Sequence, residues 1–168
     1  MNAASDLRVR PANPADLEAL VALEAACFLP EDRFPRRSFR RLLMGTNVVL
    51  LAELEGRVVG QAILLFRATS KVARLYSLSA DPSVRGRGLG RALLEASEDA
   101  ARARGADRQR LEVRASNEAA LRLYRLAGYT TLGEKPGYYP DGETALHLEK
   151  ALESPPTSGG MHPVGASS

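Results

Sequence analysis

The sequence predicts a mixed α/β domain with about seven strands and four helices. Three observations lead to this prediction. Stretches of strand composition alternate with stretches whose apolar residues recur at helical spacing. Three predicted strands follow one another through short turns, which favours an antiparallel meander. A glycine-rich segment, 85–90 (RGRGLG), then separates the third of these strands from a long helix.

The first half of the chain supplies four of the strands and two of the helices. Asn13-Pro14-Ala15-Asp16 (NPAD) is typical of a helix start, and Glu55-Gly56-Arg57 is typical of a hairpin turn. The expected elements are a strand at 6–11, a helix at 17–28, a short basic helix at 38–44, and strands at 47–54, 58–67 and 73–80.

The second half follows the glycine-rich segment. Gly105 and Gly128 are natural stops for two helices, and Asn117 is a good capping residue for the second. The expected elements are a helix from 89 to Gly105, a strand at 108–114, a helix from 116 to Gly128, and strands at 129–133 and 144–150. Residues 153–168 are rich in Pro, Gly and Ser, so we expect a domain at 1–152 followed by a disordered tail.

Composition narrows the class of protein. A chain of 168 residues is long enough for one domain with a substantial core. It contains no apolar run of membrane-spanning length, and its N-terminus lacks the apolar core of a signal peptide. Cys27 is the only cysteine, which excludes an intrachain disulfide and favours a reducing, cytoplasmic setting.

The charge pattern does not indicate a nucleic-acid-binding protein. The net charge is only +3, aromatic residues make up 5% of the chain, and there is no Trp. A nucleic-acid footprint needs basic residues clustered on one face with aromatic residues among them. We therefore expect no nucleic-acid partner. We also expect no membrane partner and no metal ion.

The glycine-rich segment favours a phosphorylated ligand. Its glycines allow close approach of the backbone to a ligand, and the start of a helix offers free N–H groups and a positive dipole end. The spacing of Gly86, Gly88 and Gly90 is not that of the dinucleotide fingerprint, and no Gly-Lys-Ser/Thr of a P-loop follows. The alternative is an ordinary solvated turn between a strand and a helix.

Several other residues have two interpretations each. Glu112 is either a catalytic carboxylate or a strand residue paired with Arg110 or Arg114, and Tyr124 is either catalytic or a core residue. Cys27 is either a reactive thiol or a core residue, and His147 is either a titrating group of the site or a structural residue. The arginines of 33–41 form a solvated face or a wall that faces the substrate.

The order of elements resembles the GNAT family of acyl-CoA N-acyltransferases, and the glycine-rich segment matches their cofactor signature. Residues 111–117 (LEVRASN), the pairs at 120–121 and 123–124, 127–129 (AGY) and 137–140 (GYYP) resemble RimI-type protein N-terminal acetyltransferases. The resemblance extends over residues 6–152. It implies a GNAT fold whose sheet is mostly antiparallel, with one parallel pair flanking the cofactor.

The resemblance also implies roles for particular residues. It assigns acetyl-CoA binding to Leu78, Ser79, Ala80, Arg85, Gly86, Arg87, Gly88, Leu89, Gly90, Arg91 and Asn117. It makes Glu112 the general base and Tyr124 the general acid. The acceptor entrance is expected near 33–41 and 137–142, with Phe34, Tyr138 and Tyr139 binding the acceptor.

The predicted function is direct transfer of an acetyl group from acetyl-CoA to the N-terminal α-amine of a protein, such as a ribosomal protein. An α-amine has a pKa near 8, whereas a lysine side chain has one near ~10.4, so a carboxylate base suits the α-amine better. Tyr124 would protonate the CoA thiolate. The alternatives are acetylation of a small amine or a free peptide, and a non-catalytic module that binds acyl-CoA.

Overall fold

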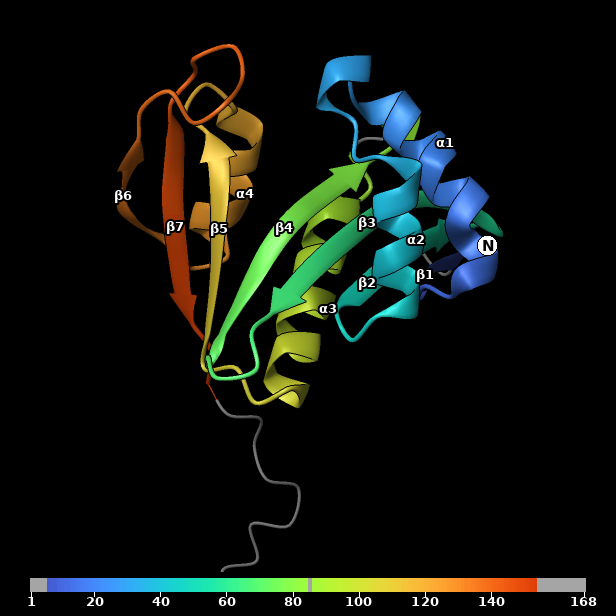
Figure 1. Cartoon of the computed structure of the whole chain (residues 1–168), viewed down its shortest axis with the longest axis horizontal. Helices are drawn as coiled ribbons and strands as arrows, with labels where there is room; N and C mark the ends of the chain where they lie inside the picture. Colours follow the sequence, from blue (N-terminus) through green and yellow to red (C-terminus); the bar gives the residue numbers. More distant parts are fainter. Residues whose placement is uncertain (1–5, 85, 154–168) are drawn as a thin grey trace, which may run out of the picture.

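The computed structural model describes residues 6–84 and 86–153, and these fold around a seven-stranded sheet (Figure 1). The strand order is β1-β2-β3-β4-β5-β7-β6. Neighbouring strands are antiparallel except β4 and β5, which are parallel. The strands are β1 (Leu7–Pro11), β2 (Val48–Leu54), β3 (Arg57–Phe66), β4 (Val72–Ala80), β5 (Arg108–Arg114), β6 (Thr130–Lys135) and β7 (Ala145–Ala151). The predicted mixed fold is confirmed, with its meander and its single parallel pair.

Four α-helices in the described ranges cover the two faces of the sheet. Helices α1 and α2 lie on one face, and α3 and α4 lie on the other (Figure 1). They are α1 (Leu17–Cys27), α2 (Arg36–Met44), α3 (Leu89–Ala103) and α4 (Glu118–Leu126), with short 3-10 turns at Pro14–Asp16, Pro30–Asp32 and Pro82–Val84. None of the helices in these ranges combines the length and apolarity needed to cross a membrane.

The predicted start signals operate as side-chain caps. Asn13 Oδ1 accepts a hydrogen bond from the Ala15 N–H at 2.9 Å, and the Asp16 carboxylate accepts one from the Asn13 N–H at 2.8 Å. At α4, Asn117 Oδ1 accepts a hydrogen bond from the Ala120 N–H at 3.1 Å. These bonds satisfy N–H groups that the first turn of a helix leaves without partners.

Strand β2 is buried on both faces, which explains its continuous apolar sequence at 48–52 (VVLLA). Leu50 packs into the larger core beneath α3 and α4, and Leu51 packs into the smaller core beneath α1 and α2. Phe39 of α2 is fully buried in the smaller core. Burial of such a side chain stabilises the fold by about 1.5–3 kcal/mol. Leu42 and Leu43 pack against the same core, so these three side chains hold the short, arginine-rich helix against the sheet.

The feature that positions the site is the separation of β4 from β5. The two strands pair only where Val72–Arg74 lies beside Arg108–Arg110. Beyond Arg74 they diverge and leave a V-shaped opening in the sheet (Figure 1). On its other side β4 stays paired with β3 as far as Ala80, which lies opposite Gly60. The far half of β4 therefore has one edge without a strand partner in the described part of the chain.

Some predicted boundaries were wrong. Helix α2 begins at Arg36 rather than at 38, because the Pro35 carbonyl already accepts hydrogen bonds from the N–H groups of Ser38 and Phe39. Strand β6 begins after Tyr129 and continues to Lys135, across an irregularity between Thr131 and Gly133. The predicted disordered tail lies outside the described residues from 154 onward.

Candidate active site

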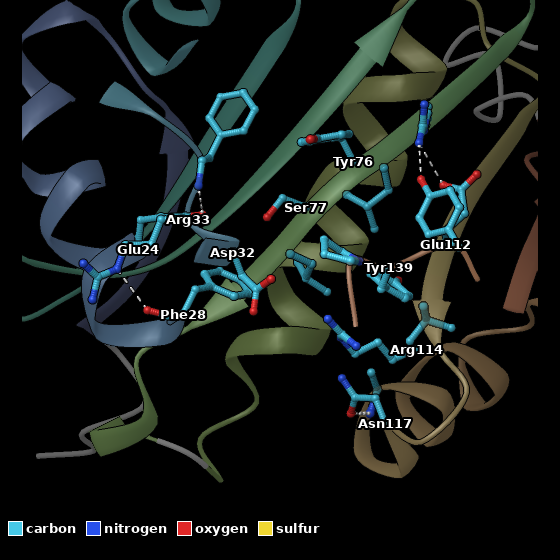
Figure 2. Close-up of a pocket in the computed structure, with 18 of the residues that line it drawn as sticks. Glu24, Phe28, Asp32, Arg33, Tyr76, Ser77, Glu112, Arg114, Asn117 and Tyr139 are labelled. Carbon is cyan, nitrogen blue, oxygen red and sulfur yellow. Dashed lines mark hydrogen bonds and ion pairs between the residues drawn. The ribbon is translucent and has the colours of Figure 1, made fainter. Parts of the chain in front are cut away.

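A cavity of about 740 Å³ opens where β4 and β5 separate. Its walls come from three parts of the chain: the end of α1 with the loop to α2, the facing edges of β4 and β5, and α4 with the loop 138–140. Figure 2 shows Glu24 and Arg33 on one side of this cavity, and Glu112, Arg114 and Asn117 on the opposite side. The fold thus brings together predicted site residues from distant segments, namely Phe34, Leu78, Glu112, Asn117, Tyr124, Tyr138 and Tyr139.

Glu112 lies on β5 with both carboxylate oxygens engaged. Oε1 is 3.0 Å from Lys135 Nζ, and Oε2 is 3.2 Å from a guanidinium nitrogen of Arg74. Its side chain is only 10% exposed. Burial raises the pKa of the carboxyl, but the Lys135 hydrogen bond and the charges of Arg74 and Lys135 outweigh burial, so the pKa lies below its usual value. Glu112 is therefore held ionised and oriented.

The ion pairs expected for Glu112 were wrong in their partners. Arg110 instead pairs with Glu149, and Arg114 pairs with Asp141 and Glu143. The residue directly across from Glu112 is His147 on β7. Burial lowers the pKa of His147, which keeps the imidazole neutral near pH 7. Strand periodicity predicts which residues share the solvent-facing side of β5. It does not predict which neighbouring strand supplies the ion-pair partner of each residue.

Tyr124 reaches the cavity from α4 but is almost fully enclosed. Its residue is 7% exposed, and its ring packs edge-on against Tyr129 with centroids 5.7 Å apart. Burial raises the pKa of the phenol well above its usual value. Tyr124 is both a core residue and a hydroxyl that borders the cavity, so the two interpretations are compatible.

Aromatic residues line part of the cavity. Phe34 packs edge-on against Phe39 and Tyr76, with centroids 4.9 and 5.6 Å apart. Tyr138 packs edge-on against its neighbour Tyr139, with centroids 5.0 Å apart. The cavity lining therefore includes aromatic side chains from the α1–α2 loop, from β4 and from the loop before β7.

The cofactor residues predicted on β4 lie on its unpaired edge. Leu78 borders the cavity, and the hydroxyl of Ser79 is buried against the Gln61 amide at 3.0 Å. Ala80 closes the strand opposite Gly60. A strand edge of this kind offers N–H and C=O groups at strand spacing to any extended amide-containing chain. Groups of this kind can form hydrogen bonds with amides such as the two in a pantetheine arm.

The glycine-rich segment contains two glycines with a backbone conformation that other residues rarely adopt. Gly86 and Gly88 have φ of +83° and +73°, where a side chain would be strained, and the space beside each is open. Leu89 and Gly90 begin α3, so its first N–H groups face the segment. Arg87 is exposed, and Arg91 pairs with Glu95. The predicted Arg85 lies outside the described residues.

Two further candidates are placed differently. Asn117 borders the cavity, but its Oδ1 is committed to capping α4, so only its amide N–H₂ remains for a ligand. Cys27 is not in the core. It is partly exposed at the end of α1, where its Sγ–H donates to the Ala80 carbonyl at 3.4 Å. Cys27 thus contacts the end of the unpaired edge of β4.

Comparison with known proteins identifies the family. Residues 17–129 match the acetyltransferase (GNAT) family. The chain belongs to this family. The N-alpha-acetyltransferase RimI of Mycobacterium tuberculosis is 36% identical over 128 residues, which are 74% of this chain and 79% of the relative. An uncharacterised protein of Mycobacterium leprae is 35% identical over 138 residues, which are 80% of this chain but 38% of that protein.

Solved structures agree with this assignment. The ribosomal-protein-S18-alanine N-acetyltransferase of Escherichia coli superposes with a TM-score of 0.79 at 27% identity, over 90% of this chain and 97% of the other. In sequence, the curated Escherichia coli ribosomal protein bS18-alanine N-acetyltransferase is 44% identical over 68 residues, which are 40% of this chain and 46% of the relative. An acetyltransferase of Salmonella typhimurium, solved with its cofactor acetyl-CoA, shares the fold at a TM-score of 0.74. The predicted GNAT fold and similarity to RimI are confirmed.

Sequence reasoning missed three residues of this GNAT site. Arg74 and Lys135 hold Glu112, and Arg74 also donates to the Tyr138 hydroxyl at 3.0 Å. Glu24 of α1 is buried in the opposite wall, where one carboxylate oxygen accepts the Phe34 N–H at 2.8 Å. The only signal for Glu24 was its place on the apolar face of a helix. In the described ranges, no group of three or more acidic, His or Cys side chains is arranged to hold a metal ion.

Proposed function

We propose that this GNAT protein transfers the acetyl group of acetyl-CoA to the N-terminal α-amine of a protein. The observation that carries the proposal is the cavity between the diverging strands. It sets an ionised carboxylate, a protonated phenol and an unpaired strand edge around one space. Similarity to RimI and to ribosomal-protein-alanine N-acetyltransferases supports a protein acceptor, such as a ribosomal protein.

We assign the donor to the β4 edge and the glycine-rich segment. Leu78, Ser79 and Ala80 would pair with the pantetheine amides. The backbone from Gly86 to the first turn of α3, with its arginines, would hold the pyrophosphate, because free helix N–H groups and positive charge favour phosphate. The open space beside Gly86 and Gly88 is consistent with this assignment. Acetyl-CoA supplies an activated acyl group, so no metal is required by the proposed reaction.

The acceptor must lose a proton before it attacks the thioester carbon. Proton transfer from an α-ammonium to an ordinary glutamate is uphill by about 5 kcal/mol, against about 8 kcal/mol from a lysine side chain. The lowered pKa of Glu112 enlarges both values equally, so an α-amine keeps an advantage of about 3 kcal/mol. Glu112 is the proposed base, and the part of the cavity lined by Phe34, Tyr138 and Tyr139 is the proposed route for the peptide.

Attack forms the C–N bond and breaks the C–S bond, which leaves a CoA thiolate to be protonated. Tyr124 borders the cavity, and its raised pKa keeps it protonated at every working pH. With ordinary pKa values near 10 for the phenol and near 8.5 for the thiol, the transfer is uphill by about 2 kcal/mol. Burial adds to this cost, and Tyr124 is a phenol that borders the cavity. Tyr124 is therefore proposed as the acid. The single cysteine is consistent with a cytoplasmic setting for the enzyme.

The test measures thiol release from acetyl-CoA with peptides that begin with Ala, Ser, Met or Gly, with their N-terminally blocked forms, and with spermidine. We expect turnover of free peptides only. Glu112→Gln should lower kcat by about 10²–10⁴-fold without weakening acetyl-CoA binding. Tyr124→Phe should lower kcat less, because the thiolate is a good leaving group. Glu55→Gln, at an exposed residue in the turn between β2 and β3, is the matched control.

Turnover confined to spermidine or other small amines would replace the proposal with a small-molecule acetyltransferase. Binding of acetyl-CoA without turnover of any amine would instead favour the non-catalytic module. If Glu112→Gln turns over free peptides as fast as the wild type, Glu112 is not the base. The assignment of a protein N-terminus as the acceptor would still stand.

A further inference from the structure

Helix α2 presents a basic face that no acidic residue in the described ranges neutralises. Arg37, Arg40 and Arg41 are exposed, and none of the three forms an ion pair within those ranges. Arg36 beside them pairs with Glu18 of α1. Three guanidinium groups within a little more than one turn form a concentrated positive surface, named here the α2 arginine face (Arg37, Arg40 and Arg41).

Part of the α2 arginine face opposes formation of the helix, because Arg37 lies in the first turn, whereas Arg41 in the last turn complements the helix dipole. The first turn of α2 contains Arg36 and Arg37 and no acidic residue, although the positive end of the helix dipole lies there. Pro35 at the N-cap gives no side-chain hydrogen bond. The helix is held instead by Phe39 on its opposite face, which is fully buried. Residues that oppose local structure in this way are typical of functional surfaces.

The α2 arginine face adjoins the acceptor end of the cavity. Pro35 and Ser38, on either side of Arg37 in sequence, both line the cavity. In the same wall, acidic side chains of Glu31 and Asp32 border the cavity. The same wall also contains Arg33, and Arg74 and Arg114 border the cavity from β4 and β5. The cavity lining therefore carries charges of both signs, whereas the α2 arginine face carries only positive charge.

The dimensions suit a polypeptide that leaves the cavity along α2. Residues 37 and 41 are separated by one helical turn, about 6 Å along the axis. An extended chain advances about 3.3 Å per residue, so two or three of its residues span the arginines. A peptide that has its first residues in the cavity and leaves it past Pro35 and Ser38 would place its following residues against this face.

We propose that the α2 arginine face binds acidic side chains of the acceptor polypeptide, a few residues beyond the acetylated amino group. This inference rests on the proposed function, because it names the class of protein acceptor for the same site. Guanidinium groups bind carboxylates through paired N–H groups, so Asp and Glu are the matching partners. Charges at the rim of an interface act mainly on encounter and on salt dependence. The acceptor sequence thus affects kcat/KM and not kcat.

The experiment compares three peptides of 12 residues that begin with the same three residues and carry Asp/Glu, Ser/Gly or Lys at positions 4–8. In 20 mM salt we expect kcat/KM for the acidic peptide to exceed that for the lysine peptide by about tenfold or more, with similar kcat. The difference should disappear near 0.5 M salt, where charges are screened within about 4 Å. The triple variant Arg37→Glu, Arg40→Glu, Arg41→Glu should reverse the order of the peptides.

A control triple variant, Arg8→Glu, Arg67→Glu, Lys71→Glu, makes the same change of net charge at exposed residues outside the cavity lining. It should keep the wild-type order. Equal kcat/KM for the three peptides, or a reversal in the control triple variant as well, would overturn the inference. A 12-nucleotide RNA that binds through the same arginines, with no peptide preference, would overturn it in favour of nucleic acid. Failure of the wild type on every peptide, with turnover of a small amine, would refute the proposed function instead.

Discussion

Lys135 controls the protonation of Glu112, and its removal is a direct test of the site geometry. The ammonium nitrogen lies 3.0 Å from Glu112 Oε1, but Lys135 is 42% exposed, so solvent screens the pair. A hydrogen bond to a charged group contributes ~1.5–3 kcal/mol when protected, and an exposed ion pair contributes ~0.2–1 kcal/mol. We take about 1 kcal/mol for this half-exposed pair. Lys135→Met should therefore raise the pKa of Glu112 by about 0.7 units.

The assay is a titration of the Glu112 side-chain carboxyl carbon by NMR from pH 3 to 8, assigned with Glu112→Gln. Lys71→Met, at an exposed lysine outside the cavity, is the matched control. A pKa of Glu112 that stays within 0.2 units of wild type, or falls, would refute the reasoning. It would mean that Arg74 alone holds the carboxylate in its ionised form.

The same substitution has a consequence for stability. The pKa of Glu112 is lower in the folded protein than in the unfolded chain. Its ion pairs therefore stabilise the fold above the unfolded pKa of about 4.3, and this stability is lost as the pH falls through the folded pKa. Lys135→Met should lower the free energy of unfolding by about 1 kcal/mol at pH 7. Urea unfolding at pH 3 should show a smaller difference, and an equal difference at both pH values would contradict the assignment.

Two further predictions concern the scaffold of the site. A Cβ on Gly60 would lie 2.8 Å from Leu93 and 3.1 Å from the Ser79 carbonyl, so Gly60→Ala should cost about 1–3 kcal/mol and weaken acetyl-CoA binding at the β4 edge. Calorimetry measures the loss of stability, and a titration with acetyl-CoA measures the loss of binding. Gly133→Ala is the control, because a Cβ there would have no neighbouring atom within 4 Å. The buried Glu98 lies 2.7 Å from Lys150 and also accepts a hydrogen bond from the Tyr129 hydroxyl. Lys150→Met would leave Glu98 with only the second contact, so this variant should destabilise the fold by about 3 kcal/mol. Loss of less than 1 kcal/mol in urea unfolding would contradict the stabilising role of the pair between Lys150 and Glu98.

The elements with local signals were predicted closely. Strand β5 coincides with the prediction at 108–114, because Leu111 and Val113 alternate with polar residues along a half-buried strand. Asn117 caps α4 as expected, because a short polar side chain before a helix has one dominant use. The boundaries that differed, at α2 and β6, depend on a proline carbonyl and on a strand irregularity, which periodicity does not record.

The sequence by itself determined the class of fold, the glycine-rich turn before α3, and which residues share a face of each helix or strand. These follow from chain-local chemistry: periodicity, capping and the backbone freedom of glycine. Only the tertiary structure decided which side chains surround Glu112, since Arg74 and Lys135 come from strands on either side of it in space, 38 and 23 residues away in the chain. It also decided that Tyr124 is enclosed and that Glu24 lies in the cavity wall. Burial and ion pairing depend on how the β4 and β5 strands separate, and that separation is a property of the whole sheet.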